Sequence, residues 1–311
     1  MEQKNNSLLE IHELSISFNM YESAFEQQTL NVISNLHLSV SAGEIVAVIG
    51  SSGSGKSLLA SAILGILPPN AELSGHLHFK GRELDAEMLA KLRGNEIALV
   101  PQSISYLDPL MKIGQQTDGH KKPYPTKKRE ELFRRFSLPE STGRIYPYEL
   151  SGGMARRVLI SSALINDAEL IIADEPTPGI SPEQAEEAMQ LFRELADAGK
   201  AIILISHDIE LAIRFADKVA VFYAGTTVET APAADFLSGP EALRHPYSRA
   251  LWRALPQNGF EPIEGLQPYA GIMRNVCPFA PRCPKASGRC FNEFPPVREL
   301  RGGEVRCFHA T

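Results

Sequence analysis

The sequence predicts an α/β fold built on a largely parallel sheet, and three observations support this. From Ser151 onward, helical patterns alternate regularly with short apolar runs, which is typical of parallel strands joined by helices. The continuous apolar run at 44–49 fits a strand buried on both faces. That run leads into a glycine-rich turn and then a helical pattern, an order typical of such folds.

The remaining elements are predicted in chain order. Alternating apolar residues at 14–18 and 36–40 predict strands of a β-rich entry region. A mixed stretch at 107–147, with a basic, proline-containing loop near 120–129, predicts an inserted helical subdomain. The full set comprises strands at 44–49, 76–80, 97–100, 169–173, 201–205 and 218–223, and helices at 56–67, 85–94, 129–137, 152–165, 182–198 and 208–216. Beyond Pro240 the composition becomes rich in proline, cysteine and arginine, which predicts a separate small appendage.

Charge and hydropathy narrow the class of protein. The formal net charge is −6, which gives no indication of nucleic-acid binding. No apolar run approaches the roughly 18 residues needed to span a bilayer, and the polar start at 1–10 lacks the apolar core of a signal peptide. We therefore expect a cytosolic chain that reaches a membrane only through partner proteins.

A phosphate-binding loop is predicted between the buried strand and the helix that follows it. Its glycines allow successive backbone N–H groups to turn toward an anion, and the helix N-terminus adds partial positive charge. Lys56 is expected to reach the β- and γ-phosphates, and Ser57 to bind Mg²⁺. The expected nucleotide-binding residues here are Gly50, Ser51, Ser52, Gly53, Ser54, Gly55, Lys56, Ser57 and Leu58.

Two later strands end in residues suited to catalysis. The apolar strand 170–173 is followed by Asp174 and Glu175, and the strand 201–205 by Ser206 and His207. At the carboxyl edge of a parallel sheet, Asp174 would hold Mg²⁺ through water and Glu175 would polarise the attacking water. Taken singly, the carboxylates could cap a helix and the histidine could be a surface residue. Their register with the phosphate loop favours catalysis.

A further short motif, Leu150-Ser151-Gly152-Gly153-Met154, begins a helix with Ser151 as N-cap. With the phosphate loop, Gln102, Asp174-Glu175 and His207, it occurs in the order and approximate spacing of the ABC ATPases, which residues 8–235 resemble. The resemblance implies a P-loop NTPase (RecA-like) core with an antiparallel β subdomain and a helical subdomain at about 103–165. It places the ATPase domain at 1–239 and a C-terminal extension at 240–311.

The same resemblance implies roles for individual residues. Two ATP molecules would lie in a head-to-tail dimer, where Ser151, Gly152, Gly153 and Met154 contact the partner's ATP. Gln102 would sense Mg²⁺ and couple the site to the membrane partner. Phe18 lies where the family places an aromatic residue on adenine, although a strand residue of the core is an equal alternative.

The tail resembles one group within the family. Residues 244–251 (Arg-His-Pro-Tyr-Ser-Arg-Ala-Leu) and 277–284 (Cys-Pro-Phe-Ala-Pro-Arg-Cys-Pro) look like the C-terminal extension of bacterial peptide and nickel importer ATPases. This implies ATP and Mg²⁺ as ligands and a position on the cytoplasmic face of the inner membrane. It also implies two membrane permeases, a second ATPase and an extracytoplasmic solute-binding protein as partners.

One position departs from the family pattern. After Glu175-Pro176-Thr177 the family usually continues into a loop ending Ala-Leu-Asp, but here Ser181 stands in place of the aspartate. In the family that loop crosses the dimer interface. The replacement raises the hypothesis that this chain pairs with a different ATPase, so that the two ATP sites differ.

The four cysteines, Cys277, Cys283, Cys290 and Cys307, all lie near the C-terminus. A reducing compartment argues against disulfides. Their spacing is wider than that of usual structural zinc sites, and four thiolates also hold [4Fe–4S] clusters. Because related extensions resemble cluster binders, an iron–sulfur cluster is favoured over zinc or free thiols.

Three functions remain open from the sequence. The first is a transport motor for peptide or metal-chelate uptake. The second is a soluble ABC ATPase acting on DNA repair or ribosomes, although the chain has one motor and no heptad tract. The third is a partly degenerate ATP-binding subunit, against which Lys56, Glu175 and His207 argue.

Overall fold

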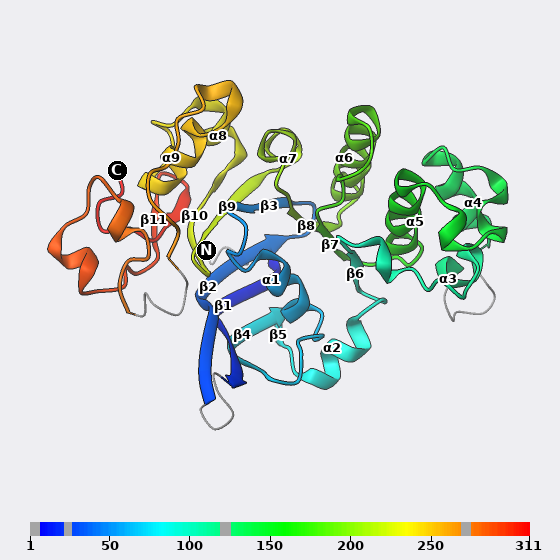
Figure 1. Cartoon of the computed structure of the whole chain (residues 1–311), viewed down its shortest axis with the longest axis horizontal. Coiled ribbons are helices and arrows are strands. Elements are labelled where there is room, and N and C mark those ends of the chain that lie inside the picture. The colour runs from blue at the N-terminus through cyan, green and yellow to red at the C-terminus, as the bar shows by residue number, and fades with distance from the viewer. Residues whose placement is uncertain (1–6, 22–26, 119–125, 269–274) are drawn as a thin grey trace, which may run out of the picture.

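The computed structural model describes residues 7–21, 27–118, 126–268 and 275–311. The chain forms two sheets with helices around them (Figure 1). Helices α3, α4 and α5 gather at one end of the molecule, and the C-terminal segment with β11 lies at the opposite end. Among the described residues, no helix is long and apolar enough to cross a membrane.

The larger sheet has eight strands and carries the predicted parallel core. Its spatial order is β11-β12-β10-β9-β3-β8-β7-β6. The strands from β9 to β6 run parallel, and β10, β12 and β11 join them antiparallel. The bounds are β3 Ile45–Gly50, β6 Ile97–Val100, β7 Leu170–Asp174, β8 Ala201–Ile205, β9 Lys218–Tyr223, β10 Thr226–Pro232, β11 Arg298–Leu300 and β12 Gly303–Val305.

The parallel strands are apolar throughout because both faces of this sheet are covered. In β3, Ile45, Ala47 and Ile49 pack into one core with the helices. Val46 and Val48 point into a second core shared with the smaller sheet. This two-sided burial explains why the predicted strands read as continuous apolar runs.

The smaller, four-stranded sheet is antiparallel, with order β2-β1-β4-β5. Its strands are β1 Ser7–Tyr21, β2 Gln27–Ser41, β4 Ala71–Phe79 and β5 Arg82–Glu83. Only parts of β1 and β2 were predicted, at 14–18 and 36–40. Register shifts between Ile11 and Ile16, with Glu13 and Asn35 at positive φ, break the alternation that marks a strand.

Six helices match the predicted ones to within a few residues, whereas α3, α8 and α9 were not predicted by residue range. They are α1 Lys56–Ile63, α2 Ala86–Leu92, α3 Ile113–Asp118, α4 Thr126–Arg135, α5 Gly152–Leu164, α6 Pro182–Asp197, α7 Ile209–Phe215, α8 Ala233–Ser238 and α9 Pro246–Arg253. Short 3₁₀ turns lie at Ile104–Tyr106, Glu140–Arg144, Pro147–Glu149, Pro256–Asn258, Ala280–Arg282 and Gly288–Phe291. The predicted basic loop near 120–129 falls largely outside the described residues.

Helix α1 ends four residues before the predicted stop at Leu67. Gly65 adopts φ +63 just after the helix, and its N–H donates to Ala62 O at 3.0 Å. The N–H of Ile66 donates to Ser61 O at 3.0 Å. A left-handed glycine with these two bonds closes a helix on its own, so the two prolines lie beyond the true end.

The segment after Pro240 is not separate from the main sheet. Strand β12 pairs with β10, so the extension continues the parallel core by an antiparallel hairpin. Arg244, which is 1% exposed, joins the two parts by ion pairs to Glu229 and Asp235. Its guanidinium also donates to the backbone carbonyls of Leu300 and Arg301.

Candidate active site

The phosphate loop connects β3 to α1 as predicted. At two of its glycines a larger side chain would clash with neighbouring atoms. A Cβ on Gly50 would lie 2.2 Å from the carbonyl oxygen of Phe222, and one on Gly55 2.9 Å from Ile33 Cγ1. Gly55 also adopts φ +97, a conformation that other residues rarely take. The turn therefore needs glycine at both positions.

Lys56 is the first residue of α1, and its side chain bonds to the backbone of the loop. Its Nζ donates to the backbone carbonyls of Gly50 at 2.8 Å and Ser51 at 2.9 Å. Burial lowers the pKa of Lys56, and the nearby carboxylates of Glu175 and Asp174 oppose that effect. The hydroxyl of Ser54 is fully buried and has no hydrogen-bond partner within the described ranges. A buried hydroxyl of this kind usually bonds to water or to a ligand.

Asp174, the last residue of β7, faces the start of α1. The Ser57 hydroxyl donates to its Oδ1 at 3.3 Å. Asp174 is 7% exposed, and its burial raises the pKa of the carboxyl, while the Ser57 bond lowers it. These oxygen donors suit Mg²⁺, which is usually bound by one or two carboxylates together with water and substrate phosphates.

Glu175 is the next residue, and its backbone is unusual. It adopts φ +48, while its N–H donates to Ile205 O on β8 at 2.9 Å. A left-handed non-glycine residue typically costs of order 1–3 kcal/mol and persists only where its surroundings enforce it. Such outliers cluster at functional sites.

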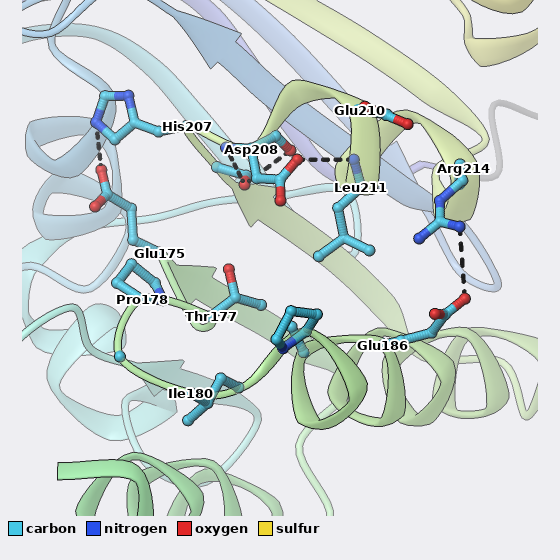
Figure 2. Close-up of a pocket in the computed structure, with 14 residues that line it drawn as sticks. Glu175, Thr177, Pro178, Ile180, Glu186, His207, Asp208, Glu210, Leu211 and Arg214 are labelled. Atoms are coloured by element: carbon cyan, nitrogen blue, oxygen red, sulfur yellow. Dashed lines mark hydrogen bonds and ion pairs between the residues drawn. The ribbon is translucent and has the colours of Figure 1, made fainter.

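Both carboxylate oxygens of Glu175 are engaged by side chains from neighbouring strand ends. Gln102 Nε2, after β6, donates to Oε2 at 2.7 Å. His207 Nε2, after β8, lies 2.6 Å from Oε1. Figure 2 shows the histidine pointing at the carboxylate. The next residue, Asp208, caps α7 by accepting from Leu211 N at 3.0 Å.

A cavity of about 660 Å³ opens beside this cluster. Its walls are the loop from Glu175 to Ile180, the start of α6 and the start of α7 (Figure 2). Across it, Arg214 and Glu186 form an ion pair at 3.5 Å. Glu175 and His207 therefore border an open space, whereas Gln102 and the phosphate loop are not among its lining residues in the described part of the chain.

The predicted signature lies apart from the phosphate loop. Ser151 caps α5 by accepting from Met154 N at 3.2 Å, and both Ser151 and Gly152 are exposed. Gly153 faces the 178–180 loop, with its ideal Cβ position 3.7 Å from Gly179 O. In Figure 1, α5 lies at the helical end and α1 in the middle of the molecule.

Three other residues named from the sequence lie in a strand, in a helix and at a helix cap. Phe18 lies in β1 opposite Leu30 and Ala71, half-buried against the core of the smaller sheet. Leu58 is half-buried in the same core. Ser181 caps α6 by accepting from Gln184 N at 3.3 Å, so the serine preserves a helix cap.

The four cysteines are free thiols in the extension. Burial raises the pKa of Cys277 to about 11 and also raises the pKa of Cys283 and Cys307. Their thiols interact electrostatically, and Cys277 N donates to Cys290 O at 3.0 Å. In the described part of the chain, no three His, Cys, Asp or Glu side chains are grouped to hold a metal ion. The donor chemistry suits a soft metal, but the arrangement is not a ligand set.

Arg156 belongs to the site and was missed from the sequence. Its guanidinium donates to Pro101 O at 2.9 Å, next to Gln102, and Asp174 and Glu175 attract its charge. Arg156 is buried on a helix face with Ala155 and Val158. An arginine at an otherwise apolar helical position was the available signal, but the helix pattern alone does not indicate its partners.

Comparison with known proteins agrees with this geometry. The family model for the ABC transporter matches residues 33–178, and the model for the oligopeptide/dipeptide transporter, C-terminal region, matches residues 228–290. A dimeric post-hydrolysis structure of the ATP-binding cassette MJ0796 with ADP and Pi has a TM-score of 0.64 and 27% identity. It covers 72% of this chain and 98% of that one.

Full-length relatives extend the match. The oligopeptide transport ATP-binding protein OppD of Escherichia coli (strain K12) is 35% identical, over 99% of this chain and 94% of its own length. The dipeptide transport ATP-binding protein DppD of the same organism is 32% identical, over 97% and 96%.

A nucleotide loop and a Gln–Glu–His cluster on one sheet edge define an ATP-hydrolysing cassette. The chain belongs to the ABC transporter family, among the ATP-binding proteins that carry the oligopeptide/dipeptide transporter C-terminal region.

Proposed function

We propose that this chain is the ATPase subunit of an importer that takes up oligopeptides or dipeptides. The observation that carries the proposal is the engagement of both Glu175 oxygens beside the phosphate loop. The names of the full-length relatives support peptides as the cargo. Nickel or a metal chelate, expected as alternative cargoes, has no support from these relatives.

In this proposal each residue has a defined task. Lys56 and the loop N–H groups bind the phosphates, and Glu175 accepts a proton from the attacking water. His207 and Gln102 hold that carboxylate in place. Ser57, Gln102 and Asp174 would hold Mg²⁺, which neutralises developing phosphate charge when bound.

The exposed signature supports a composite site. Ser151, Gly152, Gly153 and Met154 lie at the start of α5, and α5 lies at the helical end of the molecule while α1 lies in the middle (Figure 1), so a second ATPase would bring its phosphate loop to them. We expect that ATPase to be a different chain, because of Ser181. Mass measurement of the native complex tests this, and a pure homodimer would contradict it.

We also place the chain on the cytoplasmic face of the membrane, bound to two permeases and served by a solute-binding protein. Affinity purification of the tagged chain from solubilised native membranes, followed by mass spectrometry, tests this set. Recovery of the permeases and a second ATPase supports the importer. Recovery of ribosomes or DNA-repair proteins would support the soluble alternative.

The four thiols carry a further part of the proposal, a [4Fe–4S] cluster in the extension. It is supported by the resemblance of the tail and by the ability of four thiolates to hold such a cluster, although the described side chains are not grouped as a ligand set. Binding requires the deprotonation that burial opposes, so metal loading would release protons. Iron and sulfide analysis after anaerobic purification tests it. Zinc alone, or metal-free thiols, would contradict the cluster.

A further inference from the structure

The phosphate loop is in direct contact with the C-terminal extension. The hydroxyl of Ser51, the second residue of the loop, donates to Oε1 of Gln267. The phenol of Tyr247, at the start of α9, also interacts with Ser51, which opposes the rise that burial causes in the pKa of this phenol. Two residues separated from the loop by about two hundred positions in sequence therefore hold one loop side chain.

Tyr247 is anchored within a buried aromatic cluster. It is 2% exposed, and its ring centroid lies 4.4 Å from that of Tyr223 and 5.4 Å from that of Phe279. Phe279 is 1% exposed and lies between Cys277 and Cys283. The packing thus leads from the cysteine segment to the Tyr247 phenol and on to Ser51.

Arg282 makes a second set of contacts, which fix the backbone just before Gln267 and do not involve Ser51 directly. The Arg282 guanidinium donates to Glu264 O at 2.7 Å and to Ile263 O at 2.8 Å. It also donates to the Tyr223 hydroxyl at 3.2 Å. Arg282 is adjacent to Cys283, and the backbone it fixes lies a few residues before Gln267.

Ser51 connects these contacts to the nucleotide site. Its carbonyl accepts a hydrogen bond from Lys56 Nζ at 2.9 Å, and its hydroxyl bonds to the extension. A loop fixed in its binding conformation binds a ligand more tightly, because less ordering remains to be done on binding.

We propose that Tyr247, Gln267 and Arg282 are positioning residues for the phosphate loop, so that the extension sets the affinity of the site for MgATP. The inference rests on the proposed role of the loop in nucleotide binding. It assigns to the cysteine-bearing extension a regulatory task on the ATPase, since any change in the packing of 277–283 reaches Ser51.

The test uses the full-length chain, with MgATP affinity measured by calorimetry and KM and kcat measured in the complete transporter. Tyr247→Phe and Gln267→Ala each remove one group of the extension that contacts Ser51. Each should raise the MgATP dissociation constant and KM by about 3- to 10-fold, the effect of losing one hydrogen bond. The kcat should stay within about twofold, since no group on the reacting atoms changes.

Arg282→Met tests the remote contacts, because Arg282 does not bond to Ser51. It should weaken MgATP binding in the parent chain but have little added effect in a Gln267→Ala background, since both changes break the same connection. Arg298→Met is the matched control. Arg298 bonds to Ala310 O within the extension and should leave affinity unchanged.

The possible outcomes distinguish a failure of this inference from a failure of the proposed function. If the parent chain binds MgATP and Tyr247→Phe and Arg282→Met bind it equally well, the inference is wrong and the nucleotide site stands. Tighter binding in these variants would also overturn it. If the parent chain fails to bind MgATP while Lys56→Ala behaves identically, the proposed role of the loop itself fails.

Discussion

At the residue scale, the proposed general base is Glu175. Its carboxylate is held by Gln102 and His207, and its backbone adopts a left-handed conformation beside the open cavity. The side chain is thus fixed in one orientation before any substrate binds. Such preorganisation is what a base acting on water requires.

Replacing Glu175 with Gln keeps the shape and removes the proton acceptor. We expect kcat for ATP hydrolysis to fall by about 100-fold or more, the usual contribution of a general base, with MgATP affinity retained. Steady-state hydrolysis and nucleotide binding in the assembled transporter measure both. Glu186→Gln in the same cavity, where Glu186 pairs with the exposed Arg214, serves as the control. Parent-level hydrolysis by Glu175→Gln would refute the assignment.

Asp174 provides a pH-dependent prediction. Burial raises the pKa of its carboxyl, so folding disfavours its charged form. At neutral pH, Asp174→Asn should therefore raise the thermal midpoint of the nucleotide-free chain while abolishing Mg²⁺-dependent hydrolysis. As pH falls through the raised pKa, Asp174 becomes protonated in the folded chain and the difference in midpoint should shrink. A difference that grows on acidification would contradict this account.

At the scale of elements, helix α6 depends on the unusual Ser181. The serine caps the helix that borders the cavity, in place of the aspartate that the family usually carries. Ser181→Ala should lower the free energy of unfolding by about 1 kcal/mol, whereas Ser181→Asp should retain it, since both serine and aspartate accept the capping bond. Urea unfolding measures the two variants. Equal stability of Ala and Asp variants would exclude the capping role.

The join between the extension and the main sheet gives another prediction at this scale. Glu229 is fully buried and pairs with Arg244, which is equally buried. Arg244→Leu would leave this charge without its partner, at a cost of about 3–5 kcal/mol in unfolding free energy. Arg253→Leu breaks an exposed pair with Glu241 and should cost less than about 1 kcal/mol. Denaturant unfolding compares them, and similar losses would contradict the role of the buried pair.

Sequence patterns predicted some of these elements with correct bounds and missed others, and the difference has a physical cause. The parallel strands carry long apolar runs, so β6, β8 and β9 were predicted with the bounds observed. The long β1 and β2 were not, because bulges interrupt their alternation. The hairpin β11–β12 is short, and its outer strand is largely exposed, so the sequence pattern did not predict it. Its pairing with β10 is a tertiary contact that only the structure shows.

The residues of the site also divide into those that a local motif predicts and those that only the tertiary structure brings together. Lys56, Asp174, Glu175 and His207 follow strand ends within recognisable motifs, and their proximity follows from a parallel sheet. The contacts of Arg156 with Pro101, and of Tyr247 and Gln267 with Ser51, join segments far apart in sequence. No local pattern predicts such contacts, because the first depends on how α5 packs beside β6 and the others on how the extension packs against the rest of the chain.

At the scale of the whole molecule, the chain is built to act with others. Its signature, of which Ser151 and Gly152 are exposed, begins α5 at the helical end, whereas α1, which follows the phosphate loop, lies in the middle of the molecule (Figure 1). Its described residues include no membrane-spanning helix. In the proposed function, a second ATPase completes each site and permeases convert hydrolysis into transport.

The most direct test of this account is ATP-driven uptake of a labelled oligopeptide by the complete transporter reconstituted in lipid vesicles. We predict uptake that requires ATP, accompanies hydrolysis, and is lost when Glu175→Gln replaces the parent chain. Uptake that persists at the parent rate in the Glu175→Gln transporter, or ATP hydrolysis with no peptide movement, would contradict the central claim.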